Sequence, residues 1–358
     1  MAIANAARPL DYHRCVDTTK ATHDDGWAID DPVTRLRIRG DEHAYDLPNS
    51  EPGTTLVIGA AEDCDVVLRD PSGCVSRHHA HLARERDAWI LSDRGSTNGI
   101  RQDGERRLSF HLTPGVELEI GGVTLIAESP RLMALRAFLS RILGWDHARL
   151  GVVDQGLQAV RAMATRRAAL VLCGDGDLRG VVRRLHDLAL GHDRPFIACG
   201  EHETLKVDPE SSGTCCFVDD KLPDDFAALA ATLTAADSKA RLVVCSPSRE
   251  DATEAMTQLE RSAVLELPAL DARSQDIERL IFDYAEDAVA ALEAPSNGFR
   301  EHELVWLGSL RFASLDEIEE VTYRLVALRN WSVRGGAQRL GISHVALSRW
   351  ARRRRIPT

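Results

Sequence analysis

Two short stretches in the first third of the sequence bring together side chains that suit a small anion. Residues 74–82 read CVSRHHAHL, and residues 93–100 read DRGSTNGI. Hydroxyl, guanidinium and side-chain amide groups are directed hydrogen-bond donors, and a small oxyanion needs such donors together with positive charge. The opposite end of the chain reads RWARRRRIPT, a run of guanidinium groups that suits a long polyanion. The sequence therefore predicts two anion-binding regions of different kinds.

The sequence around the first of these anion-binding regions has the pattern of short strands. Between residues 33 and 127, alternating runs such as TTLVIG, HAHLARE and AWILSD are separated by turn signals such as DPSG and RGSTNG. Many short strands at such spacing predict a β-sandwich. Residues 1–32, ahead of these strands, are weakly patterned, and we expect a flexible leader there.

The rest of the chain changes to a mixed pattern and then to a helical one. Residues 128–145 predict a connecting helix, with leucines at three- and four-residue intervals. In residues 146–295 the apolar runs AALVLC, RPFIACG, TCCFVDD and ARLVVCS alternate with helical stretches, which predicts a parallel α/β sheet. Residues 296–328 are helical again, and residues 329–358 predict two helices around a tight turn, followed by a basic tail.

Four motifs in the β-rich part resemble the forkhead-associated (FHA) domain family. In chain order they are Gly59, Asp65-Val66-Val67-Leu68, Ser76-Arg77-His78-His79 and Ser96-Thr97-Asn98-Gly99. Four blocks in the family's order and at its spacing are a specific match, whereas a single block would be weak. The resemblance implies a β-sandwich over residues 33–127 whose loops read phosphothreonine in a partner protein.

The resemblance also implies a role for each motif residue. A hydroxyl at Ser76 and a guanidinium at Arg77 suit a phosphate, and the side-chain amide of Asn98 suits the peptide backbone beside it. The implied phosphopeptide-binding residues are Ser76, Arg77, Thr97, Asn98, Gly99 and Arg69. The implied structural residues are Gly59 and His79, the latter bracing the loop from inside.

One residue departs from the family pattern. The family has an arginine directly after the glycine at position 59, and that arginine pairs with the phosphate, whereas this chain has Ala60. Loss of such a charge-assisted contact costs about 1.5–3 kcal/mol. Either Arg69 or Arg77 would have to compensate. The alternative is an FHA scaffold that contacts its partners without depending on phosphate.

Residues 146–327 resemble the AAA+ domain of sigma-54-dependent enhancer-binding activators. The similarity is clearest in LPALDARSQDIERLIFDYAEDA at 267–288 and in FASLDEIEEVTYRLVAL at 312–328. The second stretch corresponds to the family's helical lid. The resemblance implies an α/β AAA+ core over residues 146–295 and a lid over residues 296–328.

The active-site motifs of that family have decayed in this chain. A P-loop ends in Lys and Ser or Thr, which hold the terminal phosphates and Mg²⁺, whereas CGDGDLRG at 173–180 has neither and carries two acidic residues. The segment between 196 and 215 is too short for the family's sigma-contacting loop. The implied degenerate nucleotide site is Gly174, Gly176, Arg179, Asp219 and Asp220. We expect a pseudo-ATPase scaffold that is no enzyme and uses neither ATP nor another cofactor; an unusual nucleotide binder remains the alternative.

The last segment resembles the Fis-type helix-turn-helix that forms the C-terminal domain of the same activator family; its sequence is NWSVRGGAQRLGISHVALSRWARRRRI. We expect Gly341 to form the turn and Val345 to pack with Leu347 or Trp350. The implied DNA-binding residues are Ser343, His344, Ser348, Arg349, Arg352, Arg353, Arg354 and Arg355. Such motifs bind half-sites as dimers. The alternative is a packed helical hairpin with a solvated basic tail.

Charge and cysteine usage agree with a DNA-binding regulator. The formal net charge of the chain is −11, yet residues 329–358 contain eight arginines and no acidic residue, which indicates a local contact with nucleic acid. The eight cysteines form no CxxC pair, which is typical of buried thiols in a reducing compartment. We expect no metal site, no signal peptide, no membrane contact and a cytoplasmic location.

These observations predict a multidomain bacterial transcriptional regulator. Its partners would be double-stranded DNA and a phosphothreonine-containing protein, either a Ser/Thr kinase or a kinase substrate. It would form a homo-oligomer such as a dimer, or a mixed assembly with an intact AAA+ paralogue. Two alternatives are an ATP-dependent sigma-54 activator with atypical motifs and a phospho-dependent signalling adaptor that does not bind DNA.

Overall fold

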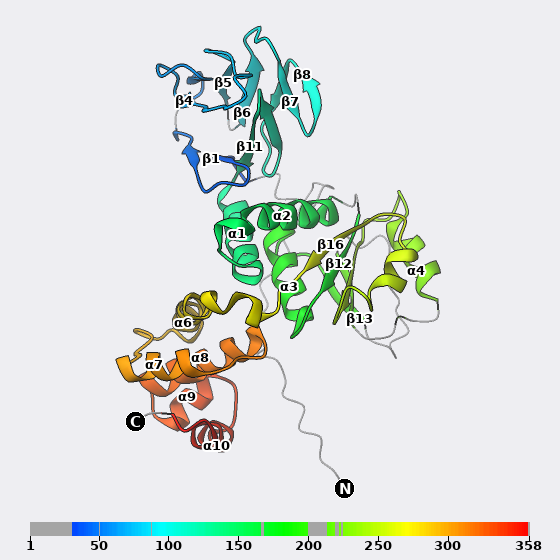
Figure 1. The fold of residues 1–358 in the computed structure, drawn as a ribbon. Coiled ribbons are helices and arrows are strands. Elements are labelled where there is room, and N and C mark those ends of the chain that lie inside the picture. Colours follow the sequence, from blue (N-terminus) through cyan, green and yellow to red (C-terminus); the bar gives the residue numbers. More distant parts are fainter. Residues whose placement is uncertain are drawn as a thin grey trace. The chain divides into compact units, whose positions relative to one another are not determined.

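The computed structural model describes residues 31–49, 51–86, 88–165, 168–199, 213–218, 222 and 225–356. These residues form two compact units, the first ending at Leu267 and the second beginning at Pro268 (Figure 1). The predicted leader lies outside the described residues except for Asp31 and Pro32.

The first unit begins with a two-sheet sandwich. One sheet has the strand order β2-β1-β11-β10-β7-β8, and the other has the order β4-β3-β5-β6-β9. The first sheet comprises β1 (Arg35–Ile38), β2 (Ala44–Asp46), β7 (Ile100–Gln102), β8 (Glu105–Arg107), β10 (Glu117–Ile120) and β11 (Val123–Glu128). The second sheet comprises β3 (Thr55–Gly59), β4 (Val66–Val67), β5 (Ala80–Glu85), β6 (Ala88–Asp93) and β9 (Ser109–His111).

Alternation along these strands explains the sandwich. In β5 the buried residues Ala80 and Leu82 alternate with more exposed neighbours, and in β6 Trp89 and Leu91 do the same. Side chains from both sheets, among them Leu36 and Leu118, meet in one continuous apolar core. The predicted N-terminal β-sandwich is therefore confirmed.

The second part of the same unit is a five-stranded sheet in which every pairing is parallel. It comprises β12 (Ala169–Cys173), β13 (Phe196–Cys199), β14 (Thr214–Val218), β15 (Arg241–Ser246) and β16 (Ser262–Glu266). The order is β13-β14-β15-β12-β16, so β12 lies inside the sheet and all five of its residues are buried. The predicted parallel sheet is confirmed, with β16 as an additional strand that the apolar runs did not indicate.

Helices accompany this sheet. They are α1 (Pro130–Leu143), the 3-10 turn η1 (His147–Arg149), α2 (Leu150–Ala164), α3 (Leu178–Ala189), α4 (Phe226–Thr234) and α5 (Thr253–Thr257). Helix α1 lies within the range predicted for a connecting helix; Ser129 caps it by accepting the N–H of Leu132. None of the described helices in the chain is long and apolar enough to span a membrane.

A buried charge network joins β1 and β11 to α2. The guanidinium of Arg37 is fully buried, and it donates to Glu128 at 2.7 Å and to Asp154. Asp154 also accepts the backbone N–H of Gly40 at 2.7 Å. Burial works against the charged form of Arg37, but the two carboxylates outweigh it and raise the pKa of Arg37. The sandwich thus shares a paired polar interface with α2.

The second unit is helical. It comprises the 3-10 turn η2 (Leu270–Asp276), α6 (Ile277–Leu292), α7 (Glu301–Ser309), α8 (Leu315–Asn330), α9 (Val333–Arg339) and α10 (His344–Arg354). Helix α8 contacts both α6 and α9, and α9 contacts α10. Gly336 lets α9 approach α8 closely, because a Cβ there would lie 3.0 Å from the carbonyl oxygen of Ala327.

One packing prediction for the last two helices is wrong. Val345 was expected to pack, but its side chain is 43% exposed. Leu347 and Trp350, three residues apart on α10 and expected to pack with Val345, are both buried. A helix turns by 100° per residue, so the face that carries Leu347 and Trp350 points away from Val345.

Candidate functional site

The β3–β4 and β4–β5 loops are held together by their backbones. Ala60 donates to the carbonyl of Ser76 at 3.1 Å, and Ala61 donates to that of Arg77 at 3.0 Å. A Cβ on Gly59 would lie 2.1 Å from the carbonyl oxygen of Arg77, so the loops approach this closely because residue 59 has no side chain. The glycine predicted to be structural therefore fixes the position of the Ser76-Arg77 segment.

His79 braces the same segment from inside. Its side chain is fully buried, and its Nδ1 accepts the backbone N–H of Ser76 at 3.0 Å. Because Nδ1 is an acceptor, Nε2 carries the proton and donates to the carbonyl of Gly99 at 3.1 Å. One imidazole thus ties the loop that carries Ser76 to the loop that carries Asn98.

The polar groups of the two loops converge on one surface. The backbone N–H of Thr97 donates to Ser76 Oγ at 3.3 Å, and Asn98 Nδ2 donates to the carbonyl of Cys74 at 2.8 Å. The side chains of Arg77, Thr97 and Asn98 are exposed, and Ser76 is half-buried. The structure therefore brings together the four residues that the motifs separated by about twenty positions.

Two arginines supply charge near these loops. Arg69 and Arg77 are exposed, and within the described residues neither side chain makes a hydrogen bond or an ion pair with another group. Ala60, where the family has arginine, is exposed as well. Gly99 has a φ of +72°, and a Cβ there would lie 2.7 Å from Nε of Arg106, a further exposed arginine that the motifs did not indicate.

Two carboxylates that the sequence reasoning missed shape the loops. Asp70 Oδ2 accepts the backbone N–H groups of Cys74, Val75 and Gly122, and Oδ1 accepts from Ser72. The bond from the Ser72 hydroxyl and these backbone bonds lower the pKa of Asp70 to about 2. Asp93 accepts the Ser96 hydroxyl at 2.5 Å, and Ser96 Oγ in turn accepts from Gly99. The Asp-x-Ser spacing within DPSG is a turn signal that would have indicated the first carboxylate.

The predicted degenerate nucleotide site lies at the turn between β12 and α3. Gly174 and Gly176 have φ values of +145° and +97°, and Arg179 is in the first turn of α3. Asp177 caps the helix, since its Oδ1 accepts the backbone N–H of Gly180 at 3.0 Å. A helix N-terminus binds anions through such N–H groups; here the chain's own carboxylate occupies one of them. Asp219 and Asp220 lie outside the described residues.

The predicted DNA-binding residues lie on α10 and the turn before it. Gly341 has a φ of +65°, and Ser343 caps α10 by accepting the N–H of Ala346 at 3.1 Å. The exposed residues of the set are Ser343, His344, Arg349, Arg352, Arg353 and Arg355, and Ser348 is half-buried.

Arg354 differs from the other arginines of the set because it is paired within the protein. It donates to Glu317 of α8 at 2.5 Å. Although burial opposes the charged form of Glu317, the bonds from the Ala313 N–H and from Arg354 lower the pKa of Glu317. Arg354 therefore secures α10 to α8, whereas the other four arginines of the set are exposed and form no ion pair with another described residue.

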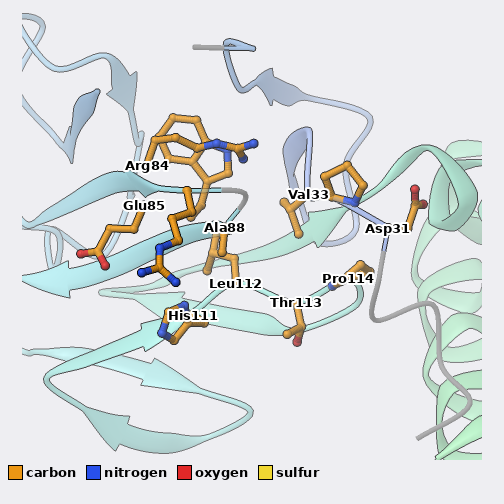
Figure 2. A pocket seen from close by; sticks show the side chains of 12 residues that line it. Asp31, Val33, Arg84, Glu85, Ala88, His111, Leu112, Thr113 and Pro114 are labelled. Atoms are coloured by element: carbon orange, nitrogen blue, oxygen red, sulfur yellow. The ribbon is translucent and has the colours of Figure 1, made fainter. Parts of the chain in front are cut away.

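A hollow of about 840 Å³ lies beside the β5–β6 turn (Figure 2). Arg84, Glu85, His111 and Thr113 line it together with Asp31, and the guanidinium of Arg84 lies 5.5 Å from the ring centre of Trp89. Acidic and basic groups are mixed along its wall. No residue that the sequence assigned to a site lines this hollow.

Comparison with known proteins places the similarity in the sandwich. A family model described as the cytoplasmic domain of an inner membrane component of the type III secretion system (T3SS) matches residues 39–130. No curated protein matches the sequence.

Three solved structures are each similar to about a quarter of the chain. An FHA domain from a study of phosphothreonine-dependent FHA interactions is 24% identical over 26% of this chain and 93% of its own, with a TM-score of 0.24. Mycobacterium tuberculosis EmbR, in complex with a low-affinity phosphopeptide, is 26% identical over 26% of this chain and 24% of its own, with a TM-score of 0.24. The FHA domain of CT664 from Chlamydia trachomatis is 22% identical over 26% of this chain and 95% of its own, also with a TM-score of 0.24. The family model thus covers most of the N-terminal β-sandwich.

Proposed function

We propose that this protein is a DNA-binding transcriptional regulator that docks a phosphothreonine-containing partner through its FHA region. The observation that carries the proposal is the arrangement around His79, whose two ring nitrogens hold the Ser76 and Gly99 backbones in place. This frame presents Arg77, Thr97 and Asn98 to solvent on one surface. Phosphate recognition needs such fixed donors next to positive charge.

Each group has a distinct task in this proposal. The Ser76 hydroxyl and the Thr97 N–H, which now bond to each other at 3.3 Å, turn to the phosphate oxygens. Arg77 and Arg69 supply the charge that the alanine at position 60 does not. Asn98 keeps its Nδ2 bond to Cys74, and its Oδ1 accepts an N–H of the bound peptide.

The α/β part acts as a scaffold in this proposal and turns over no nucleotide. The closed N-terminus of α3 supports this, because a phosphate there would meet the carboxylate of Asp177 instead of a free N–H group. The turn also lacks the lysine that a P-loop uses to hold terminal phosphates. The scaffold would assemble with a second copy, or with an intact AAA+ paralogue.

Binding of double-stranded DNA is assigned to α10. The helix follows a glycine turn, is capped by Ser343, and exposes His344 and Arg349 near its beginning and middle. Side chains at such positions reach base edges when a helix lies in the major groove. Arg352, Arg353 and Arg355, further along, would contact phosphates on either side.

The phosphothreonine assignment is tested with the full-length protein and pairs of fluorescent peptides that contain either threonine or phosphothreonine. We expect selective binding of phosphorylated peptides, and we expect Ser76→Ala to weaken it about tenfold to a hundredfold. Ser109→Ala is the matched control, because this exposed serine belongs to β9 and bonds only to Ser92 among the described residues. Equal binding of both peptide forms would leave the FHA region as a phosphate-independent docking surface.

The DNA assignment is tested by gel shift and anisotropy on the protein's own upstream region at several salt concentrations. We expect Arg352→Ala to reduce the salt slope by about one unit, and Arg349→Ala to relax sequence preference. Arg311→Ala, an exposed arginine between α7 and α8, is the control. Absence of a bound species at low salt would refute DNA binding and favour the adaptor, and ATP turnover would favour the sigma-54 activator.

A further inference from the structure

Three potential metal ligands meet beside the Ser76-Arg77 segment. They are the carboxylate of Asp63, the thiol of Cys64 and the imidazole of His78, and their ligand atoms all lie within 4.8 Å of one another. Asp63 and Cys64 belong to the β3–β4 loop, and His78 belongs to the β4–β5 loop. Cys64 and His78 are 14 positions apart in the sequence, so the loop packing creates this cluster.

The frame beneath the cluster is already ordered. The N–H of Ala61 donates to the carbonyl of Arg77 at 3.0 Å, and the N–H of Cys64 donates to the carbonyl of Ala61 at 3.1 Å. His78 Nε2 lies 3.1 Å from Asp63 Oδ1, and Cys64 Sγ lies 3.2 Å from the carbonyl oxygen of Arg77. Ligands on two loops that are bonded to each other lose little freedom when an ion binds.

We propose that Asp63, Cys64 and His78 bind a zinc ion. One sulfur, one imidazole nitrogen and one carboxylate oxygen are the donor types that Zn²⁺ takes in four-coordinate sites. Three protein ligands leave a fourth position for water or an anion. The thiol binds as thiolate, so each zinc ion that binds releases one proton from Cys64 to the buffer.

The three ligand atoms need to move only slightly closer together to coordinate a zinc ion. Zn–S bonds of about 2.3 Å and Zn–N or Zn–O bonds of about 2.0–2.1 Å place tetrahedral ligand atoms roughly 3.3–3.7 Å apart. The widest pair in the cluster therefore closes by about 1 Å, which an exposed side chain supplies by a change of rotamer. The Asp63 side chain is 72% exposed and that of His78 39%, so an ion reaches the site from solvent.

The ion would link the β3–β4 loop to the β4–β5 loop. Its ligands come from either side of the Ala60–Ser76 backbone bond, so binding stabilises their contact. The site is independent of the proposed phosphothreonine recognition, because none of Ser76, Thr97 and Asn98 is a ligand. Failure of one assignment therefore leaves the other untouched.

The test titrates full-length, metal-free protein with Co²⁺ and, in competition with a chromophoric chelator, with Zn²⁺. We expect one equivalent of Co²⁺ to give the thiolate-to-metal absorption band of a tetrahedral site. We expect Cys64→Ser to remove that band and to lower the Zn²⁺ affinity more than about tenfold. Cys74→Ser is the matched control, since this exposed thiol lies in the β4–β5 loop outside the cluster and its loss leaves the band intact.

His78→Ala gives a second variant, because this exposed side chain is not part of the apolar core. We expect it to weaken Zn²⁺ binding to the same degree, and we expect Zn²⁺ to raise the unfolding temperature of the wild-type protein and not of this variant. A band that persists in Cys64→Ser or disappears in Cys74→Ser would overturn the assignment. So would the absence of binding at one equivalent.

Discussion

Two glycine-bearing turns of this protein present opposite arrangements to an anion. In the N-terminal β-sandwich, the buried His79 holds the loops together, and Arg77 and Asn98 are exposed. In the turn between β12 and α3, the carboxylate of Asp177 folds back onto the N–H of Gly180. The first arrangement leaves the Arg77 guanidinium without a hydrogen-bond partner among the described residues, and the second satisfies a donor within the chain. Whether such a turn can bind an external anion thus depends on whether one of the chain's own carboxylates already occupies its N–H groups.

The largest expected effect concerns the frame of the open site. A Cβ at position 59 would overlap the carbonyl oxygen of Arg77, and backbone atoms cannot rotate out of the way. We expect Gly59→Ala to lower the free energy of unfolding by about 2–3 kcal/mol and to abolish phosphopeptide binding. Urea unfolding and peptide titration measure the two effects.

The matched control for that change is Gly151→Ala. Gly151 lies in α2, and a Cβ there meets nothing within 4 Å. Alanine is the better helix former, so we expect this variant to be unchanged or more stable by up to about 1 kcal/mol. Equal stability of the two variants would contradict the role assigned to Gly59.

The second prediction concerns a substitution that places a guanidinium at position 60, where the family has arginine. Position 60 is exposed and its N–H already bonds to Ser76, so Ala60→Arg adds charge beside the loop without disturbing the core. We expect the affinity for phosphothreonine peptides to rise about tenfold to a hundredfold, equivalent to about 1.5–3 kcal/mol. Fluorescence anisotropy measures it. Ala60→Gln, which lengthens the side chain without charge, should gain far less; an equal gain would exclude a phosphate contact.

The sequence predicted most of the exposed residues in the loops around Ser76 and Asn98, but it predicted fewer of the residues that hold these loops in place. Ser76, Arg77 and Asn98 were identified because they stand in ordered motifs, and the sandwich followed from strict alternation in the strands. Asp70 and Asp93 were missed because their bonds, to backbone N–H groups and to the Ser72 and Ser96 hydroxyls, form only once the loops have folded. The Asp63–Cys64–His78 cluster was missed because two loops must pack before its members meet.

In the rest of the chain, some sequence patterns were too short to predict an element or the orientation of its side chains. Four apolar runs predicted the parallel strands, but β16, with the sequence SAVLE, has too few consecutive apolar residues to stand out. The basic end was predicted from its charge and turn, whereas Val345 was placed on the wrong face because adjacent apolar residues on a short helix leave its orientation ambiguous.

A third, smaller effect is expected at the closed turn. Asp177→Ala removes the cap of α3, and we expect the free energy of unfolding to fall by about 1 kcal/mol. Asp177→Ser should recover most of this loss, since serine is an equally good cap. Thermal unfolding measures both. A loss in the serine variant as large as in the alanine variant would argue against the capping role.

The smallest expected effect is a pH dependence in the FHA loops. The pKa of Asp70 is lowered to about 2, whereas an unfolded chain has about 3.9. Asp70 therefore contributes stability above about pH 4, and this contribution is lost as the pH falls toward 2. NMR titration of the Asp70 carboxyl measures the value directly. A midpoint near 4 would show that the backbone bonds to Asp70 do not persist in solution.

The most direct test of the account compares both turns in one protein sample. Full-length protein is titrated in parallel with a phosphothreonine peptide library, with the unphosphorylated library, and with Mg-ATP. The account predicts phospho-selective binding at the FHA loops and no binding of ATP at millimolar concentration. Saturable ATP binding, or peptide binding that ignores phosphorylation, would contradict the division between an open anion site and a closed one.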